Sequence, residues 1–149
     1  MSRTGSFTYS IEAPCDAATA VALLADPRRS GELHPLIQSV EEVPVQPGAL
    51  ASYRITDLLP LGPLRLPIVY EADVLTASPT DVVTVARQRP RTTVRNETLV
   101  TDSAHGVDIA VTITMTAPTL LFGYAFRTAR AAHLELAQRI ARRLTDAVR

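Results

Sequence analysis

The last third of the chain carries its clearest pattern, in which apolar residues recur three and four positions apart from Leu120 to Val148. This spacing predicts an amphipathic helix with one wide apolar face. His133 lies on the same face, and the opposite face is rich in arginine. A helix of this kind needs a surface to cover, and a helix held across a curved sheet can enclose a cavity. The apolar face consists of Phe122, Phe126, Ala129, Ala137, Ile140, Leu144 and Val148.

Alternating apolar and polar residues predict seven strands ahead of this helix. The first, Ser6–Glu12, is followed by two short helices, Ala17–Ala25 with Asp16 as its cap and a second around Arg28–Leu33. Short turns rich in Pro, Gly and Asp separate the later strands, which predicts an antiparallel meander. The order of elements is that of a single α+β domain over 1–149. The six later strands are expected at Ser39–Val45, Leu50–Asp57, Ile68–Ala77, Val82–Gln88, Thr93–Thr101 and Val107–Thr116.

Composition narrows the possible functions. Fifteen basic and fifteen acidic residues give a formal net charge of zero, which argues against a nucleic-acid partner. Cys15 is the only cysteine, and the three histidines lack metal-ligand spacing, so we expect neither a disulfide framework nor a metal. No phosphate-binding or other cofactor motif is present, and we expect no cofactor. Without a signal peptide or a long apolar run, the expected location is the cytoplasm, with no stable membrane insertion.

Several short segments resemble those of one superfamily. Ile11–Asp16 resembles its first-strand exit, Ala25–Pro27 its helix ending, His34-Pro35 its entry into the second strand, and Gly48–Arg54 its glycine followed by an alternating strand. With the order of elements, the chain resembles the helix-grip fold of the START and plant-allergen superfamily, also called SRPBCC, although it lacks the Trp of many bacterial members. The resemblance implies a hydrophobic pocket between the sheet and the terminal helix. Members bind lipids, sterols, hormones or polyketides, and some are cyclases, aromatases or dehydratases.

The segment Leu58–Pro67 is unusual because its prolines predict a loop while its composition is rich in leucine. In a meander it shares one end of the sheet with His34–Leu36, Gln88–Thr92 and Ala117–Phe122. We interpret it as a hydrophobic gate at a pocket mouth. Alternatives are packing of the leucines on the sheet edge and a contact in a homodimer. The gate residues are Leu59, Pro60, Leu61 and Gly62.

The strands that face the helix supply candidate ligand contacts, although the sequence alone does not fix their register. Tyr53 and Tyr70 are favoured because tyrosine offers an apolar ring and one polar group, while ordinary core positions remain the alternative. The expected ligand-binding set is Tyr53, Ile55, Tyr70, Ala72, Val85, Leu99, Ile113, Met115, Phe122, Phe126 and His133.

His133 is the candidate catalytic residue. A neutral imidazole on the inner helix face can donate a proton or a hydrogen bond to a ligand carbonyl, although a core histidine paired with a strand residue is the alternative. Glu97, beside Arg95, is a weaker acid–base candidate if its strand face points inward, whereas solvation of both charges near the strand end is the favoured interpretation. Arg87, Arg89, Arg91 and Arg95 form a basic hairpin that is either solvated or able to recruit an anionic headgroup.

Three functions remain open from the sequence. The first is binding of a small hydrophobic molecule, and the second is a metal-free polyketide-type cyclase, aromatase or dehydratase that uses His133. The third is a lipid or quinone chaperone that touches a membrane through Leu58–Leu66 and the Arg-rich helix face. A His133–tyrosine or His133–Glu97 pair within hydrogen-bond reach favours chemistry, scattered tyrosines favour binding, and outward-pointing gate leucines are needed for membrane contact.

Overall fold

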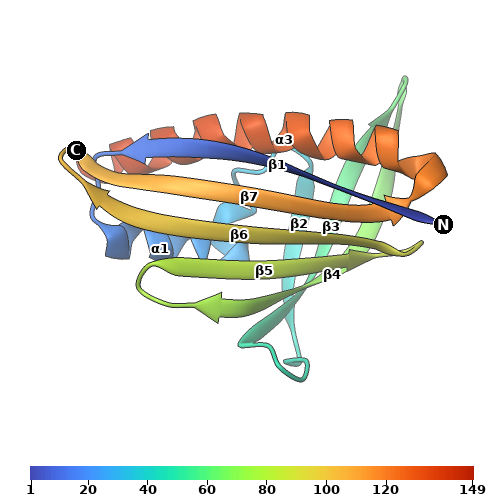
Figure 1. Ribbon diagram of the computed structural model, residues 1–149, viewed down its shortest axis with the longest axis horizontal. Coiled ribbons are helices and arrows are strands. Elements are labelled where there is room, and N and C mark those ends of the chain that lie inside the picture. The colour runs from blue at the N-terminus through green and yellow to red at the C-terminus, as the bar shows by residue number, and fades with distance from the viewer.

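The computed structural model describes residues 1–149 and contains one seven-stranded antiparallel sheet with a long helix along it (Figure 1). The strand order is β1-β7-β6-β5-β4-β3-β2. This confirms the expected α+β helix-grip architecture, with two short helices after the first strand. The elements are β1 (Ser2–Ala13), α1 (Ala17–Leu24), α2 (Pro27–Ser30), β2 (Ile37–Val43), β3 (Ala51–Leu61), β4 (Leu64–Ala77), β5 (Asp81–Gln88), β6 (Thr92–Ser103), β7 (Gly106–Pro118) and α3 (Thr119–Asp146).

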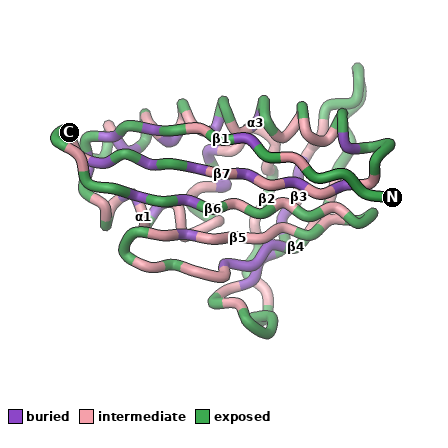
Figure 2. Tube along the Cα trace, viewed as in Figure 1, coloured by how far each residue is buried: buried purple, intermediate pink, exposed green.

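The alternation along β7 translates directly into burial. Val107, Ile109, Val111, Ile113 and Met115 are all buried, whereas the intervening residues face outward, as the colours along β7 in Figure 2 show. Successive side chains of a strand point to opposite faces, so this pattern requires one packed and one solvated face. The strand pairs with β1 on one side and β6 on the other, which places it beneath α3.

The two short helices begin where capping residues stand. The side chain of Asp16 accepts a hydrogen bond from the Thr19 amide at 2.8 Å, and Asp26 caps α2, which begins at Pro27. Helix α2 spans four residues and ends earlier than the sequence suggested. The chain then turns toward β2 through His34.

The terminal helix packs closely on β1. A side chain at Gly5 would meet the Phe122 ring, with its Cβ 2.7 Å from Cζ of that ring, so the glycine permits the close approach. The helix ends at Asp146, and Val148 lies beyond it, 51% exposed. The expected inclusion of Val148 in the helix and its apolar face is therefore wrong, because the last residues have no sheet left to cover.

The expected loop Leu58–Pro67 is also wrong, since the segment extends the β3–β4 hairpin to a turn at Gly62-Pro63. Strand β2 pairs with β3 only as far as Asp57, and β5 pairs with β4 only from Glu71 onward. Pro60 and Pro67 therefore lie where each strand has a single neighbour, and their missing N–H groups cost no ladder bond. Gly62 has φ +61°, which the tight turn requires.

Buried apolar residues form separate clusters. The largest joins β1, β6, β7, α1 and α3 and contains 15 buried residues, while a second of four residues lies on β3 and β4. Beneath α3, the space between these clusters is not filled by side chains. No helix is long and apolar enough to cross a membrane.

Candidate ligand cavity

A cavity of about 470 Å³ lies between α3 and the sheet. Of its 38 lining residues, 23 are hydrophobic, a balance typical of sites that hold small organic molecules. Leu24, Pro27 and Gly31 form one end, beside the short helices. Leu66, Arg89 and Leu121 line the other end and are also exposed, so the cavity opens there.

The sheet supplies the cavity wall through alternate residues of its strands, as the pleat requires. Ile55, Asp57 and Leu59 come from β3, and the even-numbered residues from Leu66 to Ala72 come from β4. Polar side chains interrupt this wall on the next two strands. These strands contribute Val82, Thr84, Ala86 and Gln88 from β5 and Thr92, Val94, Asn96 and Thr98 from β6.

Small residues of helix α3 stand among larger ones, Leu121, Tyr124 and Leu136, on the side that faces the cavity. Ala125, Ala129 and Ala132 line the cavity. Phe122 and Phe126 lie on the adjacent side of the helix, where Phe126 meets Phe7 edge-to-face at 5.5 Å between ring centroids. Aromatic rings thus fill the β1 side, whereas the alanines leave space over part of the β3–β5 side.

Three polar rings meet at one wall of the cavity. Tyr9 Oη and His133 Nδ1 are 3.0 Å apart, a hydrogen bond in which the tyrosine hydroxyl donates when Nδ1 carries no proton. The His34 ring stands perpendicular to that of His133, with 5.6 Å between centroids. The Leu36 amide donates to His34 Nδ1 at 3.1 Å, so the neutral His34 ring carries its proton on Nε2.

Burial keeps these rings uncharged at neutral pH. It lowers the pKa of His133 to about 4, and together with the nearby His133 and Arg139 it lowers the pKa of His34 to about 3. Burial also raises the pKa of Tyr9. At pH 7 this wall therefore presents neutral donors and acceptors rather than charges.

A second polar pair occupies the β3–β4 wall. The Tyr70 hydroxyl donates to Asp57 Oδ1 at 3.1 Å, and both residues line the cavity. Burial raises the pKa of Asp57 to about 6, although the Tyr70 hydrogen bond opposes this change. Asp57 forms no ion pair, so a carboxylate without a counter-ion faces the cavity.

Asp73, by contrast with Asp57, has a counter-ion. It accepts hydrogen bonds from Ser52 at 2.8 Å and from Arg87, which belongs to the basic hairpin. Arg95 and Glu97 form an exposed pair at 3.2 Å on the outer face, so the inward-facing strand that an acid–base role of Glu97 required is absent and the charges are solvated.

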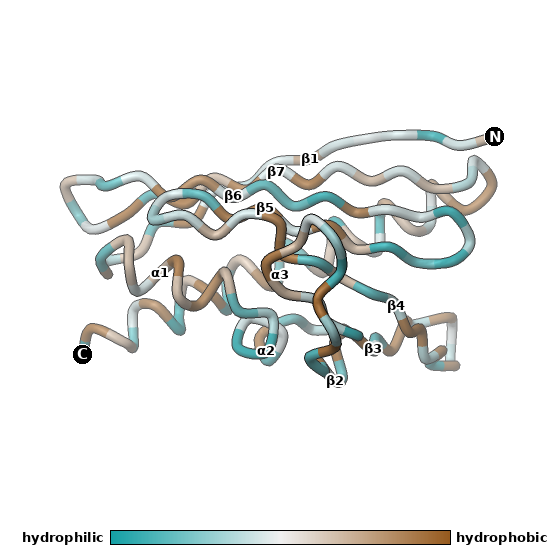
Figure 3. The backbone as a smooth tube through the Cα atoms, turned by 90° about the horizontal axis from the view of Figure 1, so that it is seen from below, coloured by the Kyte–Doolittle hydropathy of each residue, from teal (hydrophilic) through white to brown (hydrophobic).

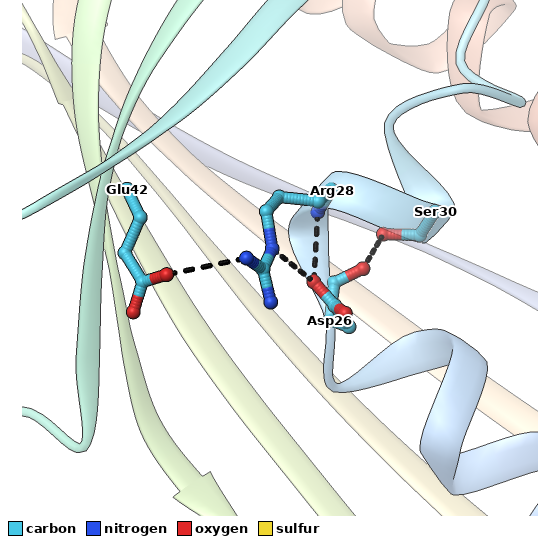
Figure 4. Close-up of polar contacts among 4 residues, drawn as sticks. All are labelled: Asp26, Arg28, Ser30 and Glu42. Atoms are coloured by element: carbon cyan, nitrogen blue, oxygen red, sulfur yellow. Dashed lines mark hydrogen bonds and ion pairs between the residues drawn. The ribbon is translucent and has the colours of Figure 1, made fainter.

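The cavity end formed by α2 is connected to the sheet by charged residues. Arg28 lies between Asp26 and Glu42, with its Nη1 3.3 Å from a Glu42 oxygen on β2, and the Ser30 hydroxyl donates to the Asp26 carbonyl (Figure 4). These contacts hold α2 beside β2. Exposed pairs of this kind contribute little stability, so their effect is on the position of α2.

The structure separates the expected ligand-binding residues into three groups. Ile55, Tyr70, Ala72, Met115 and His133 line the cavity. Tyr53, Ile113, Phe122 and Phe126 face inward but pack in the clusters around it. Val85 and Leu99 lie on the outer face, and Leu99 is 47% exposed. Their assignment to the cavity wall is wrong by one residue, because the neighbouring residues of each strand face inward.

Of the expected gate residues, Leu59 lines the cavity, while Pro60, Leu61 and Gly62 form the exposed tip of the hairpin. The Tyr124 hydroxyl donates to the Pro60 carbonyl and so connects the hairpin with α3 across the mouth. The sequence interpretation missed Asp57, Tyr9 and His34 as site residues. Of these three, only the inward direction of Tyr9 could be predicted, from the alternation along the first strand.

No protein-family model and no curated protein matches the sequence, but solved structures match the fold. The di-domain aromatase/cyclase StfQ of the steffimycin pathway aligns with a TM-score of 0.75 at 13% identity, over 97% of this chain and 51% of that chain. The di-domain aromatase/cyclase BexL of the BE-7585A pathway aligns at 0.72 and 14% identity, over 95% and 50%. Ara h 8.0201 aligns at 0.63 and 14% identity, over 93% and 98%.

The chain thus spans about half the length of each aromatase/cyclase and nearly all of Ara h 8.0201. At these identities the likeness concerns the fold, and it is the helix-grip fold that the sequence resemblance implied.

Proposed function

We propose that this protein binds a small, mostly apolar, ring-bearing molecule in the cavity beneath α3. The observation that carries the proposal is a cavity of about 470 Å³ with mainly hydrophobic walls and two separate polar pairs, Tyr9–His133 and Asp57–Tyr70. Apolar walls favour burial of the ligand, and a few fixed polar groups orient it.

The two polar pairs favour different ligand groups. The neutral His133 ring suits a carbonyl or hydroxyl oxygen. The free carboxylate oxygen of Asp57 accepts a hydrogen bond from a hydroxyl or amine. A ring system with oxygen substituents at separate positions, such as a lipid-like or polyketide-like molecule, satisfies both.

Filling the cavity tests this proposal. Ala129→Phe places a ring in the open space, whereas Ala131→Phe places the same ring on the exposed side of α3. We expect Ala129→Phe to abolish the fluorescence increase of the apolar probe 1-anilinonaphthalene-8-sulfonate and any ligand retained in native mass spectrometry. Ala131→Phe should behave as the wild type, and equal probe binding by both variants would contradict the proposal.

A second candidate function is proton-transfer catalysis on a polyketide-type substrate, favoured by the Tyr9–His133 hydrogen bond. In this function His133 exchanges a proton with the substrate oxygen, and Tyr9 holds the ring orientation. His133→Phe separates the two functions. Binding alone predicts a loss of affinity of about 1 kcal/mol, the value of one hydrogen bond. Catalysis predicts at least roughly a hundredfold loss of turnover on a poly-β-ketone substrate while binding persists.

A further inference from the structure

The open end of the cavity has an unusual charge distribution. Four segments meet there: residues 1–5, the hairpin 58–67, the β5–β6 turn 88–92 and the start of α3 at 117–127. Figure 1 shows all four at the end that carries the N-terminus. They contain no Asp or Glu. Their five arginines, called here the mouth arginines, are Arg3, Arg65, Arg89, Arg91 and Arg127.

The mouth arginines are exposed and take part in none of the seven ion pairs of the protein. The Arg3 guanidinium lies over the face of the Phe122 ring, 4.9 Å from its centroid. At the opposite end, the segments 12–16, 78–81 and 102–108 and the end of α3 at 139–149 together contain six acidic residues and four arginines. The mouth is therefore strongly positive, whereas the opposite end carries charges of both signs.

Exposed leucines stand among these arginines. Leu64 is 68% exposed and Leu120 is 98% exposed. Exposed apolar residues that gather in one patch mark sites of interaction with a protein or a membrane. Figure 3 shows hydrophobic stretches in the β3–β4 hairpin and at the start of α3, both at the end that carries the N-terminus. The rim leucines, as we call them, are Leu61, Leu64, Leu66, Leu120 and Leu121.

We propose that this rim is a docking surface for a bilayer with anionic headgroups. Leucines on two projecting tips fit between headgroups, and unpaired arginines beside them fit lipid phosphates. Leu66 and Leu121 also line the cavity, so the docked rim connects the apolar layer of the bilayer with the cavity. Self-association through the same face would bring the unpaired arginines of two copies together, which opposes a dimer. The proposal concerns the rim and does not depend on what the cavity binds.

Vesicle co-sedimentation tests the proposal with ligand-free protein. We expect binding to vesicles that contain phosphatidylglycerol, little binding to phosphatidylcholine alone, and release at high salt. Arg89→Gln with Arg91→Gln should weaken binding roughly thirtyfold, because each charge contributes about one factor of five near an anionic surface. The matched pair Arg142→Gln with Arg149→Gln removes the same charge far from the rim and should leave binding within about twofold.

The apolar contribution has its own matched pair. Leu64→Ser with Leu120→Ser should reduce vesicle binding about tenfold or more, whereas Val45→Ser with Leu50→Ser, also exposed, should not. Circular dichroism verifies that each variant is folded. Absence of binding to phosphatidylglycerol vesicles at low salt, or equal weakening by both arginine pairs, overturns the proposal. Concentration-dependent dimerisation that Leu64→Ser with Leu120→Ser abolishes would also overturn it and assign the rim to self-association.

Discussion

Helix α3 covers two halves of the sheet that are built in opposite ways. On the β1 and β7 side, 15 buried residues form a continuous core in which Phe126 packs edge-to-face on Phe7. On the β3 and β4 side, the buried cluster has four residues, and Ala125 and Ala129 face open space. The same helix therefore packs closely on one half and leaves a cavity over the other, where alanines stand among the larger residues Leu121, Tyr124 and Leu136.

The comparison also extends to polar groups. The inward face of β7 is entirely apolar, whereas the cavity wall carries Asp57 and Tyr70, and His133 lies at its border with β1, beside Tyr9. Burying such groups costs free energy unless they are paired. These groups are paired by the hydrogen bonds described above, and their concentration around the cavity supports the proposed function in ligand binding.

The largest expected effect separates the two halves by truncation. Ile113 is fully buried in the packed half, so Ile113→Ala should lower the free energy of unfolding by about 4 kcal/mol, because it leaves a void. Ile68→Ala, on the cavity wall, should cost about 1 kcal/mol, because its side chain already borders empty space. Urea denaturation of both variants measures the difference, and equal losses would contradict the division into packed and open halves.

The next effect is the loss of stability at low pH that the buried histidines beside the cavity cause. The folded pKa of His133 is about 4, below its ordinary value of 6.5, so the unfolded chain binds more protons between these pH values. The stability associated with neutral His133 is complete above pH 6.5 and is lost as the pH falls to 4, by about 3 kcal/mol. His34 contributes in the same direction down to pH 3.

His133→Phe removes one of these two contributions. Its free energy of unfolding should fall less steeply between pH 6.5 and 4 than that of the wild type, in denaturation series at fixed pH values. His105→Gln, at the exposed β6–β7 turn, is the matched control and should keep the wild-type slope. Parallel curves for His133→Phe and the wild type would show that the ring is not buried neutral.

These contrasts explain which parts the sequence could predict. The β7 alternation reports burial directly because one face is packed and the other solvated. In β5, apolar residues occupy both faces, so Val85 could not be distinguished from its neighbours Thr84 and Ala86. In β6 the cavity wall includes Asn96 and Thr98, and apolarity therefore wrongly favoured Leu99.

The polar pairs of the site could be predicted even less well from the sequence. Tyr9 and His133 are 124 positions apart, and no local pattern reports such a contact. Asp57 stood at the expected end of a strand, where a carboxylate is ordinarily solvated. It became a cavity residue only because Leu58–Leu61 continues the strand past it, despite Pro60.

A smaller effect should come from Asp57. Its folded pKa of about 6 exceeds the ordinary value of 3.8, so the folded chain holds the proton more tightly and stability falls as the pH rises from 4 to 6. Asp57→Asn removes the buried charge and keeps an acceptor for Tyr70. We expect it to raise the free energy of unfolding by about 1–2 kcal/mol at pH 7, with no gain at pH 4, where the wild-type carboxyl is mostly protonated. A loss of stability at pH 7 would show instead that the carboxylate holds the wall together.

The smallest effect tests the hydrogen bond that connects the hairpin with α3 across the mouth. The Tyr124 hydroxyl donates to the Pro60 carbonyl, and Tyr124→Phe removes this bond while keeping the ring. Because the bond is exposed, global stability should fall by no more than about 1 kcal/mol. The hairpin tip at 59–64 has a single neighbour on each strand, so its opening is coupled to this bond rather than to the sheet. Hydrogen exchange of the amides at 59–66 should therefore become faster in Tyr124→Phe, whereas exchange in β7 should not change.

If Leu59, Pro60, Leu61 and Gly62 form a gate, a bound ligand should slow the same amides in the wild type. Exchange at the tip that responds neither to the substitution nor to the ligand would mean that the hairpin is a fixed wall.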